Sequence, residues 1–258
     1  YITQHEGAVD LIVGCENETL RSDWLPRYAA GSALTTIGYS QLTTSRQGGK
    51  PAMQATREPG GYRLDGVMPW VTGAPYVTNV ACGATLSDGE QILSLVTLTA
   101  RGVRIQPAAP LAALNSSHTC EVFCEGVFCP DEALIAGPEP AVLSKRSALR
   151  LLLVSATGTG LAYAMMDELD ALSKGKNFGL ERDLLRDVRP RCEALRARLH
   201  ALADDERLDP PAIDSLRVEI NDWLMRLASV LMVGAKGSGY YMSARPQRLA
   251  REAMFFCV

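Results

Sequence analysis

Long apolar segments, basic runs and paired cysteines of the metal-binding type are all missing from this chain of 258 residues. No apolar run approaches the roughly 18 residues that a membrane-spanning helix needs, so we expect no membrane span. Lys and Arg number 26 against 29 Asp and Glu, which gives a net charge of -3 and no basic stripe of the kind that binds nucleic acid. The composition, 47% hydrophobic and 21% charged, is that of an ordinary globular protein.

The seven cysteines are scattered, odd in number and without any CxxC pair. Such usage fits a reducing compartment, where Cys serves as a small buried hydrophobe, so we expect a cytoplasmic location. Cys120, Cys124 and Cys129 cluster near His118, but their spacing matches no usual zinc site. Because Cys120 and Cys124 lie at even spacing in a strand-like run, one buried face explains them, and we expect no metal.

The signatures of several catalytic classes are also absent: there is no GxSxG, no P-loop and no GxGxxG after a strand. The three histidines, His5, His118 and His200, have no acidic or cysteine partner at motif spacing. The chain begins at Tyr1 rather than Met and ends on an apolar run. Both ends therefore look cut, and we expect an interior piece of a longer protein.

The first half of the chain changes in texture near residue 33. Residues 5–30 have helical spacing, and Ser22 could cap a short second helix within them. From 33 to about 136, six or seven short strands alternate with Gly, Pro and Asp turns, and Asp65-Gly66 is interpreted as a tight hairpin turn. This predicts an antiparallel β-barrel or sandwich. The predicted strands include residues 35–43, 62–71, 77–86, 92–99, 103–107 and 119–127.

The second half predicts four helices. The first covers residues 144–173, and the second covers 180–203 with Pro190 as an expected kink. Asp209 followed by two prolines starts the third, which runs to about 234. The fourth begins near Ala244 and is still running at the end of the chain. Short connections between long helices predict an up-down four-helix bundle, so the fold class is α+β.

Several segments, in their order along the chain, resemble motifs of the acyl-CoA dehydrogenase family. No single motif is specific, but their order and spacing are, and the resemblance runs from about Glu6 to the chain end. It implies three parts: residues 1–32 as a remnant of an N-terminal helical domain, 33–138 as the β-domain and 139–258 as the C-terminal bundle. The segments are 61–66 (GYRLDG), 69–74 (PWVTGA), 117–130 (SHTCEVFCEGVFCP), 177–179 (NFG), 237–240 (GSGY) and 248–253 (RLAREA).

The resemblance implies FAD as the cofactor. Trp70 and Thr72 match positions whose aromatic ring and hydroxyl approach the isoalloxazine ring, and Thr43 matches a donor to its pyrimidine edge. Hydroxyl and backbone N–H donors near such a ring tune it, and an aromatic side chain shields it from water. The alternative is that Trp70 is only a half-buried sheet aromatic and Thr72 a strand-end residue, since strands favour both types.

The resemblance also implies a substrate site, from which the sequence departs. Thr44 stands where the family has an acid, Ser45 where it has a proline, and Gly49 where a serine contacts the acyl-CoA, while Gly48 is retained. A CoA contact is therefore missing. The alternative for residues 45–49 is a flexible polar loop.

Three further residues are implied to serve the cofactor of a neighbouring subunit. Phe178 matches a residue near the FAD adenine, and Gly237 and Gly239 would let backbone approach the dinucleotide. Gly175 replaces the usual pyrophosphate arginine, for which Lys174 or Lys176 would be a weaker substitute, and Val233 replaces a glutamine. The glycines fit an interhelical turn about equally well.

The catalytic base cannot be assigned from the sequence. Dehydrogenation of an acyl thioester needs a carboxylate beside the α-carbon, and the family places it in one of two positions. One would fall about two residues beyond Val258, and the other holds Leu149. The acids Asp167, Glu168 and Asp170 have the spacing of a solvated helix face.

Taken together, the resemblance implies an FAD-dependent oxidoreductase of fatty acid metabolism. It would remove an α-proton from a CoA thioester, a carrier-protein thioester or a related molecule, with hydride transfer to the flavin. The implied assembly is a homodimer or homotetramer. Two alternatives stay open: a flavin monooxygenase on the same fold, and a degenerate homologue that only scaffolds a partner.

Overall fold

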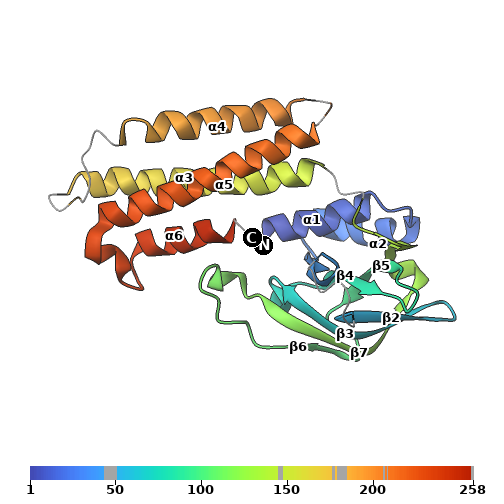
Figure 1. Ribbon diagram of the computed structural model, residues 1–258. Helices are drawn as coiled ribbons and strands as arrows, with labels where there is room; N and C mark the ends of the chain where they lie inside the picture. Colours follow the sequence, from blue (N-terminus) through green and yellow to red (C-terminus); the bar gives the residue numbers. More distant parts are fainter. Residues whose placement is uncertain are drawn as a thin grey trace. The chain divides into compact units, whose positions relative to one another are not determined.

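The structure is a computed structural model, and it falls into two compact units. It describes residues 1–43, 51–144, 148–175, 178, 185–205, 207 and 209–256, with only the backbone of 148–151. The first unit comprises Tyr1–Leu111 and Asn115–Lys145, and the second comprises Ala112–Leu114 and Arg146–Val258. The N-terminal helices, expected as a remnant of a separate domain, thus lie in the same unit as the sheet (Figure 1).

Two helices precede the sheet: α1 (Ile2–Val13) and α2 (Glu18–Ala29). Asn17 caps α2, because its Oδ1 accepts the Leu20 N–H at 3.1 Å. Its Nδ2 donates to the carbonyls of Asp131, Glu132 and Leu134 at 2.9–3.2 Å, which ties the start of α2 to the distant turn before the last strand. A second helix within 5–30 was expected, but its cap at Ser22 was wrong, since Ser22 lies inside α2.

The described residues of the first unit contain one eight-stranded sheet, with the order β6-β7-β3-β2-β4-β5-β8 and β1 beside β4. Most pairs are antiparallel, as expected, but β1 and β2 each pair with β4 in parallel. The strands missing from the prediction are β2 and β8. The bounds are β1 (Thr35–Gly38), β2 (Met53–Glu58), β3 (Gly61–Val71), β4 (Asn79–Thr85), β5 (Gln91–Thr97), β6 (Val103–Ile105), β7 (Cys120–Pro130) and β8 (Leu134–Glu139).

The predicted hairpin at Asp65-Gly66 is wrong, because β3 runs straight through it. Gly66 has φ +136°, and a Cβ there would lie 2.1 Å from the carbonyl oxygen of Ala52. The Val67 N–H donates to that same carbonyl at 2.8 Å. The glycine therefore permits a close approach of β2 to β3 instead of a chain reversal.

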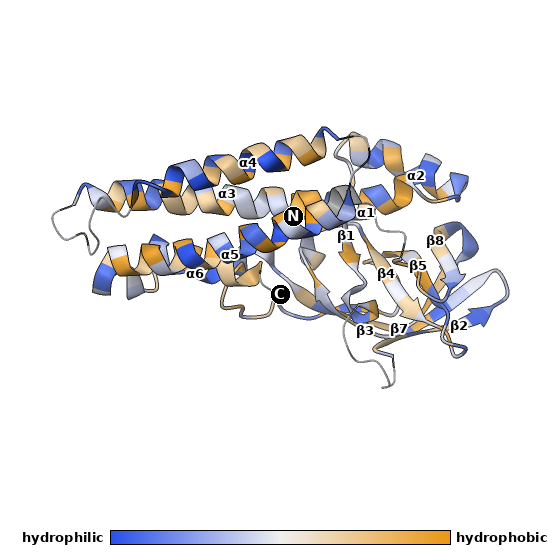
Figure 2. Ribbon diagram, turned by 45° about the horizontal axis from the view of Figure 1, so that its top comes forward, coloured by the Kyte–Doolittle hydropathy of each residue, from blue (hydrophilic) through white to orange (hydrophobic). Residues whose placement is uncertain are grey.

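The second unit contains four long helices, as predicted: α3 (Ala148–Ser173), α4 (Val188–Ala203), α5 (Pro210–Ala235) and α6 (Arg245–Phe255). Hydrophilic and hydrophobic residues alternate along α4 and α5 (Figure 2), as expected when one face is buried. The helix α3 packs against each of the other three. Pro190 does not kink α4, because it lies in the first turn. The helix α6 stops at Phe255 instead of running on, and Phe256 is its C-cap.

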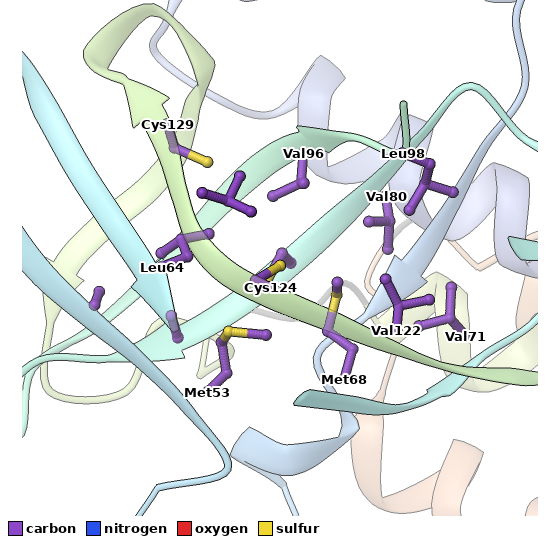
Figure 3. Close-up of a cluster of buried hydrophobic side chains, with 14 of the residues drawn as sticks. Met53, Leu64, Met68, Val71, Val80, Val96, Leu98, Val122, Cys124 and Cys129 are labelled. Atoms are coloured by element: carbon purple, nitrogen blue, oxygen red, sulfur yellow. The ribbon is translucent and has the colours of Figure 1, made fainter. Parts of the chain in front are cut away.

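Each unit has its own hydrophobic core. In the first, side chains from β2, β3, β4, β5 and β7 converge inside the sheet (Figure 3), and Cys124 and Cys129 are among them. In the second, buried leucines of α5, among them Leu216, Leu224 and Leu231, meet Met165 and Leu169 of α3. Among the described residues, no helix combines the length and apolarity needed to cross a bilayer.

Candidate functional site

The end of β3 presents Trp70 and Thr72 on its outer side. Met68 and Val71 both face the core although they are three residues apart, which strict alternation forbids. The ladder with β7 shifts register between Met68 and Val71, so an extra residue is accommodated at Pro69-Trp70. Such a bulge re-aims side chains, and here it leaves Trp70 with 54% of its surface exposed.

Three hydroxyl groups form a chain beside this strand end. Thr72 Oγ1 lies 3.3 Å from Thr119 Oγ1, which lies 2.8 Å from Ser117 Oγ. Thr119 is buried, whereas Thr72 and Ser117 are half-buried. The Gly73 N–H also donates to the Ser117 carbonyl at 2.9 Å, so the loop over 115–119 is fastened to the strand end by backbone as well as side chains.

A second exposed aromatic lies near the same loop. Tyr76 is 60% exposed, and its ring meets the half-buried His118 edge-on at 5.1 Å. His118 has φ +45°, and the Cys120 Sγ–H donates to its carbonyl at 3.3 Å. Exposed tryptophan and tyrosine beside ordered hydroxyls suit a planar ligand that stacks and also makes hydrogen bonds.

These residues fit the isoalloxazine ring that the resemblance implies. A flat ring needs an exposed aromatic side chain to lie against and polar donors at its edge, and the β3 end supplies Trp70 and the Thr72 hydroxyl. The part of the site expected around Thr44, Gly48 and Gly49 lies outside the described residues. Thr43 is exposed, and its hydroxyl and backbone N–H both donate to the Ser40 carbonyl, at 2.9 and 3.0 Å. In this conformation it offers a ligand only the acceptor side of its hydroxyl.

The cavity found elsewhere in the first unit is not part of this site. Its volume is about 250 Å³, and it is lined by residues of α2, β5 and β7, including Trp24, Val96 and Phe128. It contacts the Val127–Pro130 end of β7, whereas Val71 pairs with Cys120 at the other end.

In the second unit, Phe178 packs on the last turns of α5. A Cβ at Gly234 would lie 2.7 Å from the Phe178 ring, so glycine makes room for that ring. Gly237 faces open space, while Gly239 is buried and a Cβ there would lie 2.7 Å from Ala235 Cβ. Both glycines lie in the 3-10 turn η6 (Lys236–Tyr240). The structure thus groups Phe178 with α5 and η6, in a different unit from Trp70 and Thr72.

The acids of α3 differ from one another in environment. Asp167 is exposed, and Asp170 pairs with Arg189 at 2.7 Å with both side chains about half exposed. Glu168 departs from the expected solvated face, since its side chain is only 15% exposed and pairs with Arg245 of α6 at 3.5 Å. Glu168 and Asp170 are thus engaged with arginines, so neither is assigned as the base.

The cysteines behave as core residues, as expected from their spacing. Cys120, Val122 and Cys124 face the interior of the sheet together. Burial raises the pKa of the Cys124 thiol and of the Cys129 thiol to about 12, so neither is a ready nucleophile. Within the described ranges, no group of His, Cys, Asp or Glu side chains is arranged to hold a metal ion.

Comparison with known proteins identifies the fold. No protein-family model matches the chain. It is similar to an acyl-CoA dehydrogenase from Geobacillus kaustophilus (TM-score 0.84, 15% identity, 97% of this chain and 71% of that one). It is also similar to butyryl-CoA dehydrogenase from Megasphaera elsdenii (0.81, 18%, 98% and 71%) and to a Mycobacterium smegmatis glutaryl-CoA dehydrogenase in complex with FADH2 (0.76, 20%, 100% and 70%).

The chain has the acyl-CoA dehydrogenase fold. In sequence it is 25% identical over 170 residues to a probable acyl-CoA dehydrogenase, YngJ, of Bacillus subtilis. That match covers 63% of this chain and 45% of the relative's length, so the chain spans less than half of the curated relative it matches. The resemblance predicted from the order of the motifs is confirmed.

One residue beside the glycine segment 237–240 stands out. Lys236 directly precedes it and has φ +53° and ψ -151°, a region almost restricted to glycine. Val233, where the family has a glutamine, is 54% exposed, and Gly175, where it has an arginine, is exposed as well. These two departures therefore lie on accessible surface.

Two residues whose hydroxyls join that of Thr72, Ser117 and Thr119, were not predicted from the sequence. The motif at 117–130 contains them, but nothing local shows that their hydroxyls meet Thr72, which is 47 positions from Thr119. Strand alternation could not have found them either, because Ser117 ends the 3-10 turn η3 (Asn115–Ser117) and Thr119 precedes β7.

Proposed function

We propose that this chain is part of an FAD-dependent oxidoreductase that dehydrogenates acyl thioesters. The observation that carries the proposal is the end of β3, where an exposed Trp70 and the hydrogen-bonded hydroxyl of Thr72 stand together on the acyl-CoA dehydrogenase fold. FAD, when bound, supplies a hydride acceptor. Trp70 would cover one face of its ring and exclude water, and Thr72 would hold a ring-edge atom through its hydroxyl.

The residues that bind the substrate and take its proton are left open by this proposal. None of the acids Asp167, Glu168 and Asp170 is assigned as the base, because Glu168 and Asp170 are paired with arginines and Asp167 is exposed. A CoA thioester is the leading substrate class, in keeping with the names of the similar proteins, and a carrier-protein thioester is the variant that the missing CoA contact favours. Fatty acid metabolism and a cytoplasmic location remain predictions.

We infer that a second copy of the chain completes the site, in a homodimer or homotetramer. The last turn of α5 and the segment between α5 and α6 expose four large apolar side chains, which are unfavourable in water unless another surface covers them. They are Val233 (54%), Tyr240 (72%), Tyr241 (71%) and Met242 (77%). Gly237 and Gly239 lie in this segment, and Phe178 packs against Gly234 at its start. This placement supports their proposed role toward the cofactor of a neighbouring subunit.

Titration of the purified protein with FAD tests the proposal. We expect a yellow complex, and we expect Trp70→Ala to raise the FAD dissociation constant about tenfold, because an aromatic stack contributes about 1.4 kcal/mol. Trp70→Phe should recover most of the affinity. Phe128→Ala, which removes another exposed aromatic of the same unit, is the matched control and should bind as the wild type does. Equal affinity of the Trp70→Ala protein would reject the site.

Activity is tested separately with acyl-CoA substrates of several chain lengths and an artificial electron acceptor. Formation of the unsaturated thioester supports dehydrogenation. A yellow protein that instead consumes dioxygen and hydroxylates its substrate would be a monooxygenase on the same fold.

A second candidate is a protein of this fold that has lost FAD and acts as a scaffold. What favours it is the loss of two residues implied to bind the cofactor, since Gly175 replaces an arginine and Val233 replaces a glutamine. A colourless protein that takes up no added FAD would establish this candidate over the first.

A further inference from the structure

We infer that Thr119 is a positioning residue of this site: it sets the direction in which Thr72 presents its hydroxyl to a ring bound against Trp70. The inference rests on the proposed function and adds a residue that makes no ligand contact of its own. It follows from the three hydroxyl groups that lie in a row at the β3 end.

The first step is a count of protons. A hydroxyl has one proton to donate and two lone pairs that accept. Ser117, Thr119 and Thr72 form a chain of three hydroxyls with two links, of 2.8 and 3.3 Å. Two of the three protons are used in the links, so one is left over. It lies either at one end of the chain or on the middle hydroxyl, which would then accept from both neighbours.

The middle hydroxyl of the chain, that of Thr119, is buried. Thr119 is only 6% exposed, so water does not compete for its hydroxyl, and an unmade hydrogen bond there would be costly. The chain therefore runs in one of two senses. If Ser117 donates to Thr119 and Thr119 to Thr72, the Thr72 proton is free to point at an acceptor on the ligand. In the opposite sense, Thr72 offers a lone pair to a donor.

The third step is that the backbone fixes the geometry of this chain. Thr72 follows Val71, which pairs with Cys120, and Thr119 precedes Cys120. The N–H of Gly73 donates to the Ser117 carbonyl at 2.9 Å, and that of Ala109 donates to the Thr119 carbonyl at 2.9 Å. Because these bonds hold both sides, the Thr72 hydroxyl has a preset orientation on the face it shares with Trp70, which reduces the ordering cost of binding.

A double-mutant cycle in FAD binding tests the inference. Thr119→Val keeps the side-chain volume and removes the hydroxyl, and we expect it to raise the FAD dissociation constant about fivefold, the usual result of losing one hydrogen bond. In a Thr72→Val background the same substitution should change the dissociation constant less than about 1.5-fold, because its effect passes through the Thr72 hydroxyl. Ser116→Ala, an exposed neighbour whose side chain is outside the chain of hydroxyls, is the control and should leave binding unchanged.

The conservative variant separates positioning from packing. Thr119→Ser keeps the hydroxyl and loses a methyl group, so it should bind FAD within about twofold of the wild type even where its melting temperature falls below that of Thr119→Val. A purely structural residue would give the reverse order in affinity.

The outcomes distinguish this inference from the proposed function. Coupling between Thr119 and Thr72 supports the inference. If Thr119→Val lowers FAD affinity equally with and without Thr72→Val, or does not lower it at all, the inference is overturned. FAD binding by the wild type would still support the proposed function in that case. A wild-type protein that binds no FAD overturns both.

Discussion

Lys236 shows at the residue scale how a turn can hold a residue with a side chain in a strained backbone conformation. Its φ of +53° and ψ of -151° place it in a region where a Cβ is disfavoured, with a cost of about 1–3 kcal/mol. Its side chain is exposed. The turn into η6 dictates the conformation, and the lysine must adopt it.

Replacing this lysine with glycine should therefore stabilise the protein. We expect Lys236→Gly to raise the free energy of unfolding by about 1 kcal/mol, since relief of strain exceeds the greater chain entropy of glycine in the unfolded state. Urea denaturation of the two proteins measures the difference. Lys236→Ala is the control, because alanine removes the charge and keeps the strain, and an equal gain in that variant would contradict the explanation.

At the scale of elements, a buried hydrogen bond joins α2 to β4. The Tyr28 hydroxyl donates to Asn79 Oδ1 at 2.8 Å, and both side chains are buried. Burial is the main cause that raises the pKa of Tyr28 to about 12, and the bonds it makes oppose this. The hydroxyl thus stays protonated in the folded protein where it would ionise in the unfolded chain.

Tyr28→Phe should lower the free energy of unfolding at neutral pH by about 1–3 kcal/mol, because the Asn79 oxygen loses its donor in a buried site. The wild type should also lose stability as pH rises from about 10 towards 12, since the unfolded state releases the Tyr28 proton first. The variant lacks that contribution, so the gap between the two proteins narrows with rising pH. Urea denaturation across this pH range measures the difference, and Tyr76→Phe, at an exposed tyrosine, is the control. A stability difference between wild type and Tyr28→Phe that stayed constant with pH would contradict this explanation.

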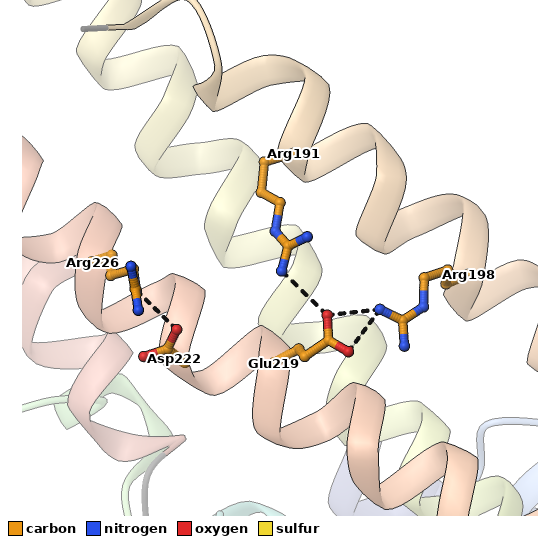
Figure 4. A network of polar contacts seen from close by, with 5 residues as sticks. All are labelled: Arg191, Arg198, Glu219, Asp222 and Arg226. Atoms are coloured by element: carbon orange, nitrogen blue, oxygen red, sulfur yellow. Dashed lines mark hydrogen bonds and ion pairs between the residues drawn. The ribbon is translucent and has the colours of Figure 1, made fainter.

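An ion-pair network joins α4 to α5 at the same scale. Arg198 Nη1 meets both carboxylate oxygens of Glu219, at 2.7 and 2.8 Å, and Arg191 Nη2 reaches one of them at 3.2 Å (Figure 4). The hydrogen bond from Arg198 is the largest cause that lowers the pKa of Glu219. Partial exposure of all three side chains keeps the contribution to stability small.

Glu219→Gln should lower the free energy of unfolding by about 0.5–1 kcal/mol at pH 7. Because folding lowers the pKa of Glu219, its ionised carboxylate stabilises the fold at every pH above the ordinary carboxyl pKa. This contribution is lost as the pH falls through the pKa of Glu219 in the folded protein. The two proteins should therefore converge in acid, as followed by thermal unfolding between neutral pH and about pH 3. Asp222→Asn breaks the pair with Arg226 inside α5 (Figure 4) and should cost about 0.3 kcal/mol or less. A larger effect from Asp222→Asn would count against the interhelical network.

The whole molecule is two compact units with separate cores, so a core defect should act first on its own unit. Leu64→Ala in the sheet and Leu224→Ala in the bundle each remove a fully buried side chain and should cost about 2–5 kcal/mol. Hydrogen exchange should show lost protection in the strands for Leu64→Ala and in α3 and α5 for Leu224→Ala. Uniform loss across both units in either variant would show that they unfold as one.

Much of the fold could be predicted because its signals are local. Asp209-Pro210-Pro211 starts α5 as expected, since proline in a first turn gives up no helical hydrogen bond. The alternation of Cys120, Val122 and Cys124 revealed the buried face of β7. The order of short motifs along the chain was enough to indicate the acyl-CoA dehydrogenase fold.

What the tertiary structure alone decided depends on contacts between residues far apart in sequence. Gly66 looked like a turn residue, but the carbonyl of Ala52, just before β2, makes it a point of close approach inside a strand. The bulge at Pro69-Trp70 and the hydroxyl chain from Thr72 to Thr119 exist because β7 lies beside β3 in one register. By itself the sequence determined the elements, their order and the residue types at the strand end. Register and packing determined which of those residues meet, because hydrogen bonds between strands form only after distant segments are aligned.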